Sequence, residues 1–276
     1  SRQYDTGLLS KVLEYLETNS ELLKEPALGL YFYYYQAMTR PDQATTTFAK
    51  FKQYLFDFQA VFSISETKDL YILALNYCIK RLNTEDKAFY LRETFDLYNG
   101  ALEQGVLLEK GQLSPFTFSN IVAVALGLGL ETWTDRFITD YSPKLDEKWR
   151  RAQTDYNRSR WYFQQKAYRK AADLLVADDF HDLHLNLSAK VLLLKVYYHL
   201  EEMQLLDHLI KRFKTFLIRK KILNYHQENY HNILRLMQRL VDLNPYSEKD
   251  KTRLRREVEK TELLTEKEWF LEQLRV

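Results

Sequence analysis

Two histidines and three aspartates gather in one short stretch, and side chains of these types can bind a metal ion. His181 and His184 lie three residues apart, beside Asp178, Asp179 and Asp182. A metal site needs ligands that converge on one point and are held by further hydrogen bonds. Acidic residues are also typical of a helix start, where they face the positive end of the helix dipole. We interpret the stretch as a helix start and expect no metal, with a metal-dependent enzyme as an alternative that His181→Ala would test.

Phosphate-binding and nucleophilic patterns are incomplete. Gly100 and Gly105 have the spacing of a phosphate-binding loop, but Val106 and Leu107 stand where that loop needs Lys and Ser or Thr. Cys78 is the single cysteine, in an apolar helical pattern, which indicates a packed thiol and fits a reducing compartment. The sequence therefore predicts no enzyme and no cofactor.

Cations are densest in one amphipathic stretch, where two phenylalanines interleave with them. The cluster consists of Lys211, Arg212, Lys214, Arg219, Lys220 and Lys221. It could bind phosphates or an acidic protein. The favoured interpretation is a solvated helix face whose cations lie near the negative end of the dipole. Both interpretations stay open at this point.

The overall charge argues against nucleic acid as the main partner. The net charge is +2, but residues 1–144 hold 14 Lys and Arg against 18 Asp and Glu, whereas residues 145–276 hold 26 against 20. This basic bias in the second half is mild for a nucleic-acid-binding surface. Nucleic acid is therefore an unlikely partner.

The composition predicts long helices. Hydrophobic residues make up 46% of the chain and charged residues 28%, while there are only seven glycines and five prolines. Sheet-rich folds need many tight turns with positive φ, so an all-α class is favoured. The longest apolar run, residues 121–130, is about half of what a bilayer crossing requires. We expect no membrane span and a cytoplasmic protein.

Residues 155–177 give the clearest picture of the elements. They read as two helices joined by a tight turn at Lys166–Ala167, with aromatic residues closing the first helix and small alanines on the second. One such hairpin cannot bury its own apolar surface, so it needs similar hairpins on either side.

Comparable corners recur along the chain. They fall at Leu130, Tyr168 and Met203, which are 38 and 35 residues apart. We expect about six to seven antiparallel helix pairs in a single elongated domain over residues 1–276. A subdivision near residues 104–113 is a further option, with an N-terminal helical region over residues 1–104 and a repeat region over residues 113–276.

Three runs carry a family resemblance. YFQQKAYRKAADLL resembles the second half of a tetratricopeptide repeat, and YYHLEEMQLLDHLI and GLGLETWTDRFI are weaker matches. The chain departs from the family where the early Trp and Leu-Gly signature falls on Asp155, Arg158 and Ser159, and no proline closes the unit. The C-terminal run LLLKVYYHLEEMQLLDHLIKRFKTFLIRKKIL is similar to uncharacterised bacterial helical-repeat proteins, which brings no function.

The resemblance implies a right-handed α-α superhelix whose concave groove binds peptides or proteins. In such a stack the first helix of each pair lines the groove. This places six groove candidates, which are Tyr71, Tyr156, Arg160, Gln164, Lys195 and His199.

The sequence thus predicts a non-enzymatic scaffold that binds a peptide or partner protein. The alternative is a pentatricopeptide-like RNA-binding array, suggested by the 35-residue spacing and the basic second half. That alternative needs base-reading pairs and a strong charge surplus, and neither is evident.

Overall fold

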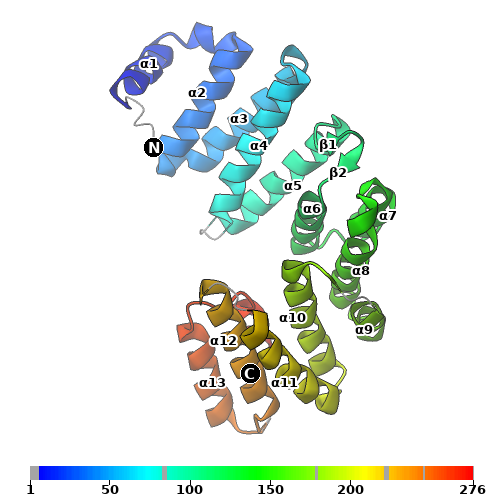
Figure 1. The fold of residues 1–276 in the computed structure, drawn as a ribbon. Coiled ribbons are helices and arrows are strands. Elements are labelled where there is room, and N and C mark those ends of the chain that lie inside the picture. Colours follow the sequence, from blue (N-terminus) through cyan, green and yellow to red (C-terminus); the bar gives the residue numbers. More distant parts are fainter. Residues whose placement is uncertain (1–5, 83–85, 178–179, 221–223, 245, 276) are drawn as a thin grey trace. The chain divides into compact units, whose positions relative to one another are not determined.

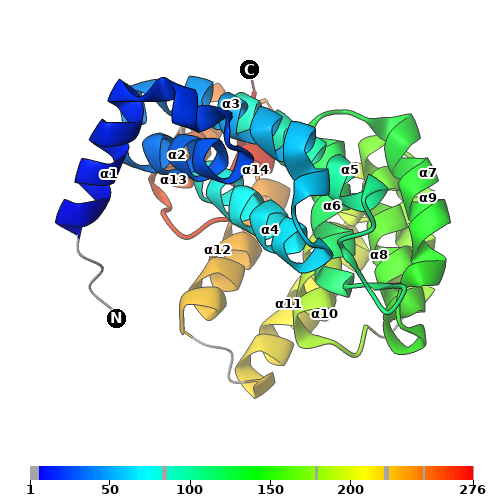
Figure 2. The same cartoon turned by 90° about the horizontal axis from the view of Figure 1, so that it is seen from above.

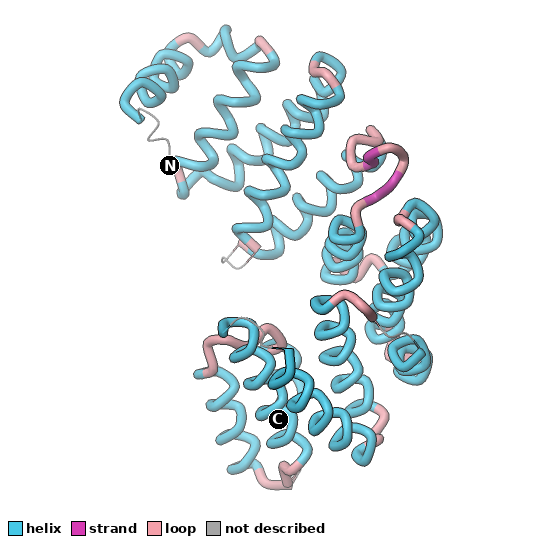
Figure 3. The backbone as a smooth tube through the Cα atoms, viewed as in Figure 1, coloured by secondary structure: helices cyan, strands magenta, loops and turns pink. Residues whose placement is uncertain are grey.

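The computed structural model describes residues 6–82, 86–177, 180–220, 224–244 and 246–275. The protein is 82% helical, and the described residues contain fourteen α-helices. Within each unit most helices pack against the next along the chain, and short loops join them, as Figures 1 and 3 show. The predicted all-α class is confirmed. No helix among the described residues combines the length and the apolarity that a bilayer crossing needs.

The chain forms two compact units, residues 1–146 and 147–276. Residues 104–113 lie inside the first unit. The elements of the first unit are α1 (Thr6–Thr18), η1 (Ser20–Lys24), α2 (Pro26–Thr39), η2 (Pro41–Gln43), α3 (Ala44–Phe58), η3 (Gln59–Val61), α4 (Ile64–Arg81), α5 (Lys87–Glu103), β1 (Leu108–Glu109), β2 (Gln112–Leu113), α6 (Pro115–Gly127), α7 (Glu131–Tyr141) and η4 (Ser142–Lys144), where η marks a 3₁₀ turn.

Aromatic side chains fill the first unit. Phe48 of α3 stacks on Tyr77 of α4, with ring centroids 4.7 Å apart, and Tyr90 of α5 meets both rings edge-on. Gly29 allows α2 and α3 to approach closely, because a Cβ there would lie 2.3 Å from a ring carbon of Tyr54. Contacts between large aromatic side chains thus form much of the core that holds α3, α4 and α5 together.

A β-hairpin interrupts the first unit. Its two short antiparallel strands, β1 and β2, are joined through Lys110 and Gly111, whose φ angles are 51° and 79°. Two successive residues with positive φ are typical of a type I′ hairpin turn. The connection between α5 and α6 is therefore partly ordered as this hairpin.

The second unit consists only of helices. They are α8 (Glu147–Gln164), α9 (Tyr168–Ala177), α10 (Leu183–His199), α11 (Met203–Lys220), α12 (Asn224–Val241), α13 (Glu248–Lys260) and α14 (Lys267–Gln273). α10 packs against α8, α9, α11 and α12, and it runs beside α11 in both views of the fold (Figures 1 and 2). Its position explains why α10 is apolar nearly all round.

Four helix ends share one geometry. A residue in the left-handed region ends the helix, and the next backbone N–H donates to a carbonyl five residues back, as from Ala167 to Tyr162 (2.9 Å). This is the hydrogen bond of a Schellman turn. The left-handed residues are Gly105, Gly129, Lys166 and Glu201. The last three are 37 and 35 residues apart, which confirms the predicted corners to within two residues.

Candidate functional site

The helix α10 has two faces with different surroundings. Lys195 and His199 lie four residues apart, hence on one face. Asn186, Ala189 and Leu193 recur at intervals of three and four and line the other side, where a groove lies open. The two sides of α10 therefore differ in what covers them.

Lys195 is held by the C-terminal segment of the chain. Its Nζ pairs with the Glu266 carboxylate at 2.7 Å and lies 4.9 Å above the Phe163 ring and 5.7 Å from the Trp269 ring centroid. The side chains of Lys195 and Glu266 are 15% and 25% exposed. A charge in such a place is stabilised only while its counterion stays beside it.

His199 is enclosed by aromatic rings. It stacks on Tyr168 with centroids 4.6 Å apart and an interplanar angle of 3°, and its Nε2 accepts a hydrogen bond from Trp269 Nε1 (3.3 Å). Burial lowers the pKa of His199 below its usual value, and the charges of Lys195 and Lys166 lower it further. The neutral imidazole is therefore favoured, which agrees with Nε2 acting as an acceptor.

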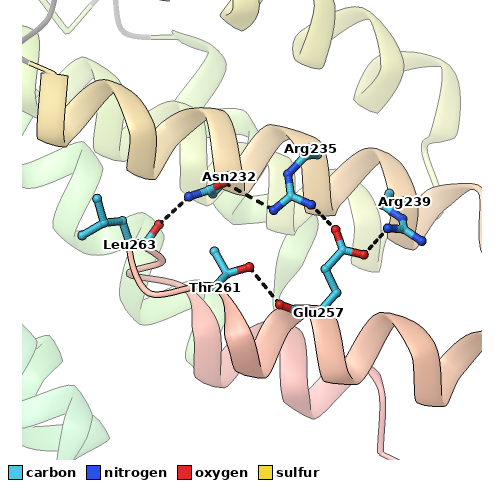
Figure 4. Close-up of polar contacts among 6 residues, drawn as sticks. All are labelled: Asn232, Arg235, Arg239, Glu257, Thr261 and Leu263. Carbon is cyan, nitrogen blue, oxygen red and sulfur yellow. Dashed lines mark hydrogen bonds and ion pairs between the residues drawn. The ribbon is translucent and has the colours of Figure 1, made fainter.

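Polar side chains of α12 hold the loop that leads to α14. Asn229 is 6% exposed, and its Oδ1 accepts from the backbone N–H of Thr265 (2.8 Å). Asn232 donates from Nδ2 to the Leu263 carbonyl (3.1 Å), as Figure 4 shows. These bonds satisfy backbone groups that the loop would otherwise leave without partners. Asn229 thus binds the backbone just before α14, which has no side-chain cap of its own.

Ion pairs also hold α13 against α12. The Glu257 carboxylate pairs with both Arg235 and Arg239 of α12 (Figure 4). The hydroxyl of Thr261 donates to the Glu257 carbonyl at 2.8 Å where α13 ends. Together these contacts hold the segment that carries Trp269 onto α10.

The expectation of an open surface at Lys195 and His199 is therefore corrected. Both side chains face α14, whose Trp269 and Phe270 are 7% and 1% exposed. The residues that cover them lie 70 and 71 positions further along the chain. The sequence shows this cover only as a short C-terminal segment in which Glu268 and Glu272 flank Trp269 and Phe270.

The other groove candidates are spread over different surroundings. Arg160 donates to Asn157 Oδ1 (3.1 Å) and lies over the Tyr156 ring, whereas Gln164 is exposed. Tyr71, in the first unit, is fully buried and donates to Gln59 (2.9 Å).

Tyr71 lines a small cavity of the first unit and not an extended groove. The cavity measures about 240 Å³, and Gly100, Asp96 and Glu103 line it as well. Burial, followed by the nearby Glu103 carboxylate, raises the pKa of Tyr71 to about 12. The phenol stays protonated and acts as a hydrogen-bond donor inside the first unit.

The open side of α10 forms the floor of a groove of about 800 Å³ between α9 and α11. Its apolar lining includes Leu175, Phe180, Leu193, Tyr197, Leu205, Leu209 and Phe216. Some of this apolar surface faces solvent, because Val176 and Leu205 are 63% and 45% exposed. An apolar concavity with polar groups at its rim is the usual form of a binding site.

Only some residues of the predicted basic cluster line this groove. Lys211, Arg212 and Arg219 line it, together with Lys190 of α10 and His208, whereas Lys214 does not. Lys211 pairs with Asp207 (2.6 Å), yet its side chain is 72% exposed. Lys221 and the side chain of Lys220 lie outside the described residues. The groove therefore gathers cations from two helices, of which sequence reasoning found only those on α11.

The remaining candidates have structural surroundings. Cys78 is fully buried, and burial strongly raises the pKa of its thiol. The Asp182 carboxylate accepts from the Leu185 N–H (2.9 Å) and so caps α10, while Asp178 and Asp179 lie outside the described residues. Across the described regions of the chain, no three His, Cys, Asp or Glu side chains group as metal ligands would.

Comparison of the chain with protein-family models, with curated proteins and with solved structures gives no match. The two units are thus defined by their own geometry, as all-α arrays in which neighbouring helices pack in succession. Any functional conclusion has to come from the groove and from the residues around it.

Proposed function

We propose that the protein is a non-enzymatic, tetratricopeptide-like scaffold that binds a segment of a partner protein in the groove between α9, α10 and α11. The observation that carries this proposal is the groove itself, about 800 Å³ with an apolar floor and exposed apolar residues at its edge. Exposed apolar surface rimmed by polar residues is characteristic of interaction sites. The three runs that resemble tetratricopeptide repeats support the same class of function.

The proposal moves the binding surface from one side of α10 to the other. The side with Lys195 and His199 holds α14, so replacing those residues would test stability before it tested binding. Leu205 is the better probe, because it is 45% exposed and lines the groove. Ile218 lies on the same helix, is 70% exposed and does not line the groove, and so it serves as the matched control.

An array of immobilised helical peptides probed with three forms of the protein tests the proposal. We expect the wild-type chain and Ile218→Asp to bind the same peptides, and Leu205→Asp to lose them. Equal binding by all three forms, or binding by none, would reject the groove as a protein-binding site. Binding of single-stranded RNA in place of peptides would favour the alternative of an RNA-binding array.

A further inference from the structure

We infer that the partner segment is an acidic amphipathic helix of about three to four turns, with its apolar face on the groove floor and its carboxylates toward Arg212 and Arg219. This inference rests on the proposed function and adds the chemistry of the partner. It follows from the sign of the charge at the groove, from its length, and from a helix that the protein already holds on the opposite side of α10.

The charge of the groove has one sign. Lys190, Lys211, Arg212 and Arg219 line it, and none of its described lining residues is acidic. No described carboxylate pairs with Arg212 or Arg219, and Lys211 keeps most of its surface exposed beside Asp207. Cations that a surface leaves available to solvent attract an anionic partner and set its orientation.

The dimensions of the groove match a short helix. Its lining residues run from Asn186 to Tyr197 on α10 and from Leu205 to Arg219 on α11. At 1.5 Å per residue these stretches span roughly 17 and 21 Å, which corresponds to about 11–14 residues of a bound helix. The walls are helices, whose backbone groups are already paired, so an extended peptide would find no strand edge to join.

The protein itself shows how such a segment is bound. The loop and helix over residues 264–274 carry Glu266, Glu268 and Glu272 beside Trp269 and Phe270. The apolar side chains are buried against the core that includes α10, and Glu266 pairs with Lys195 of α10 at 2.7 Å. Apolar anchors plus a carboxylate–lysine pair therefore already hold an acidic helix on one side of α10. On the other side, Arg212 and Arg219 of α11 offer cations to the carboxylates of a partner.

The rings of the groove do not suit nucleic acid. Binding of single strands relies on aromatic faces on which bases stack. Lys190 lies 5.1 Å over the Phe216 ring, and Phe180 is only 3% exposed. Apart from Tyr197 and His208, the rest of the apolar lining is aliphatic, which suits leucine-like anchors of a peptide helix.

Three synthetic helical peptides of about 14 residues test the inference. They share one apolar stripe and carry Glu, Gln or Lys at every remaining position, and an oligouridine of similar length is the fourth probe. Binding is measured by fluorescence anisotropy at low and moderate salt. We expect the Glu peptide to bind about tenfold more tightly than the Gln peptide, the Lys peptide to bind weakest, and the difference to shrink with salt.

Two variants with matched charge changes locate the binding. Arg212 and Lys214 are both exposed on α11, but only Arg212 lines the groove. We expect Arg212→Glu to weaken the Glu peptide by about tenfold or more and Lys214→Glu by less than about threefold. Circular dichroism of both variants checks that they fold.

The outcomes separate the inference from the function on which it rests. Equal binding of the Glu and Gln peptides, lost in Leu205→Asp, would overturn the acidic partner and leave a protein-binding groove. Oligouridine binding that Arg212→Glu abolishes, with no peptide bound, would overturn both in favour of RNA. Peptide binding that neither Arg212→Glu nor Leu205→Asp changes would also overturn both.

Discussion

The two sides of α10 use the same residue types to different ends. On one side Lys195 is paired, His199 is neutral and stacked, and Trp269 closes the surface. On the other side Lys190 and Arg212 border apolar residues that still face solvent. The difference teaches that cations beside apolar side chains can mark a surface that a distant segment covers or a surface that stays open as a groove. The two sides differ because α14, about 70 residues further along the chain, covers only the side with Lys195.

Removing the closing tryptophan should have the largest effect on this contrast. Trp269→Ala deletes a ring that is 7% exposed and removes the donor to His199. We expect the free energy of unfolding of the second unit to fall by about 3–5 kcal/mol. Chemical denaturation followed by circular dichroism measures it. Tyr246→Ala, at a side chain that is 92% exposed, is the control, and an equal loss in both variants would contradict a closed surface.

Breaking the ion pair should cost less. Lys195→Met leaves Glu266 partly buried without its counterion, and we expect a loss of about 2 kcal/mol, below that of a fully buried pair. Glu266→Gln in the same background should restore part of the loss. A double-mutant cycle measures the coupling, and additive losses would show that the two groups do not interact.

The pH dependence should report the state of His199. Its pKa is lowered in the folded protein, so the unfolded chain binds a proton more readily. Stability is therefore complete above the usual histidine pKa of about 6.5 and is lost as pH falls through and below it. The effect is smaller than the losses above, because His199 is only half-buried.

His199→Gln keeps an acceptor for Trp269 but does not titrate in this range. We expect the midpoint of unfolding of this variant to fall less than that of the wild type between neutral and mildly acidic pH. Parallel pH profiles would show that His199 does not carry the dependence.

Removing the backbone strain at the Glu201 corner should slightly raise the free energy of unfolding of the second unit. Glu201 has a φ of 57°, which costs a residue with a side chain roughly 1–2 kcal/mol. Glu201→Gly removes this strain, and the greater freedom of glycine in the unfolded chain offsets part of the gain, which leaves about 0.5–1 kcal/mol. The reverse change, Gly129→Ala at a φ of 69°, should destabilise by a similar amount. A lower midpoint of unfolding for Glu201→Gly would contradict the strain.

The smallest effect is expected on the open side. Leu205→Ala removes a side chain that is 45% exposed, and we expect the free energy of unfolding to change by less than about 0.5 kcal/mol. A loss of several kcal/mol would show that the groove belongs to the core, and the contrast between the two sides would disappear.

Local patterns in the sequence were sufficient for the helices and their corners. The turn predicted at Lys166 is confirmed by its φ of 57°. The start of α4 is local in the same sense, because Ser63 and Glu66 have the Ser-x-x-Glu spacing and form a capping box (3.3 and 2.9 Å).

The cover on Lys195 could not be predicted in the same way. Helix spacing places Lys195 and His199 on one face, but it does not show which distant segment packs there. The deciding contacts with Glu266 and Trp269 span 71 and 70 residues. Likewise, the groove is lined by Lys190 of α10 and Arg212 of α11, and their proximity depends on how the two helices pack. The sequence of α11 alone does not show that Arg212 lines the groove whereas Lys214 does not.

The all-round apolar surface of α10 also limits how the chain can be shortened. A fragment that stops at the Glu201 corner would leave Leu187, Val191 and Leu194 bare, since α11, α12 and α14 supply their neighbours. Such a fragment would tend to aggregate, whatever the quality of its remaining helices. Any trimmed version of the second unit meant for crystallisation or labelling must therefore keep the residues through Leu274.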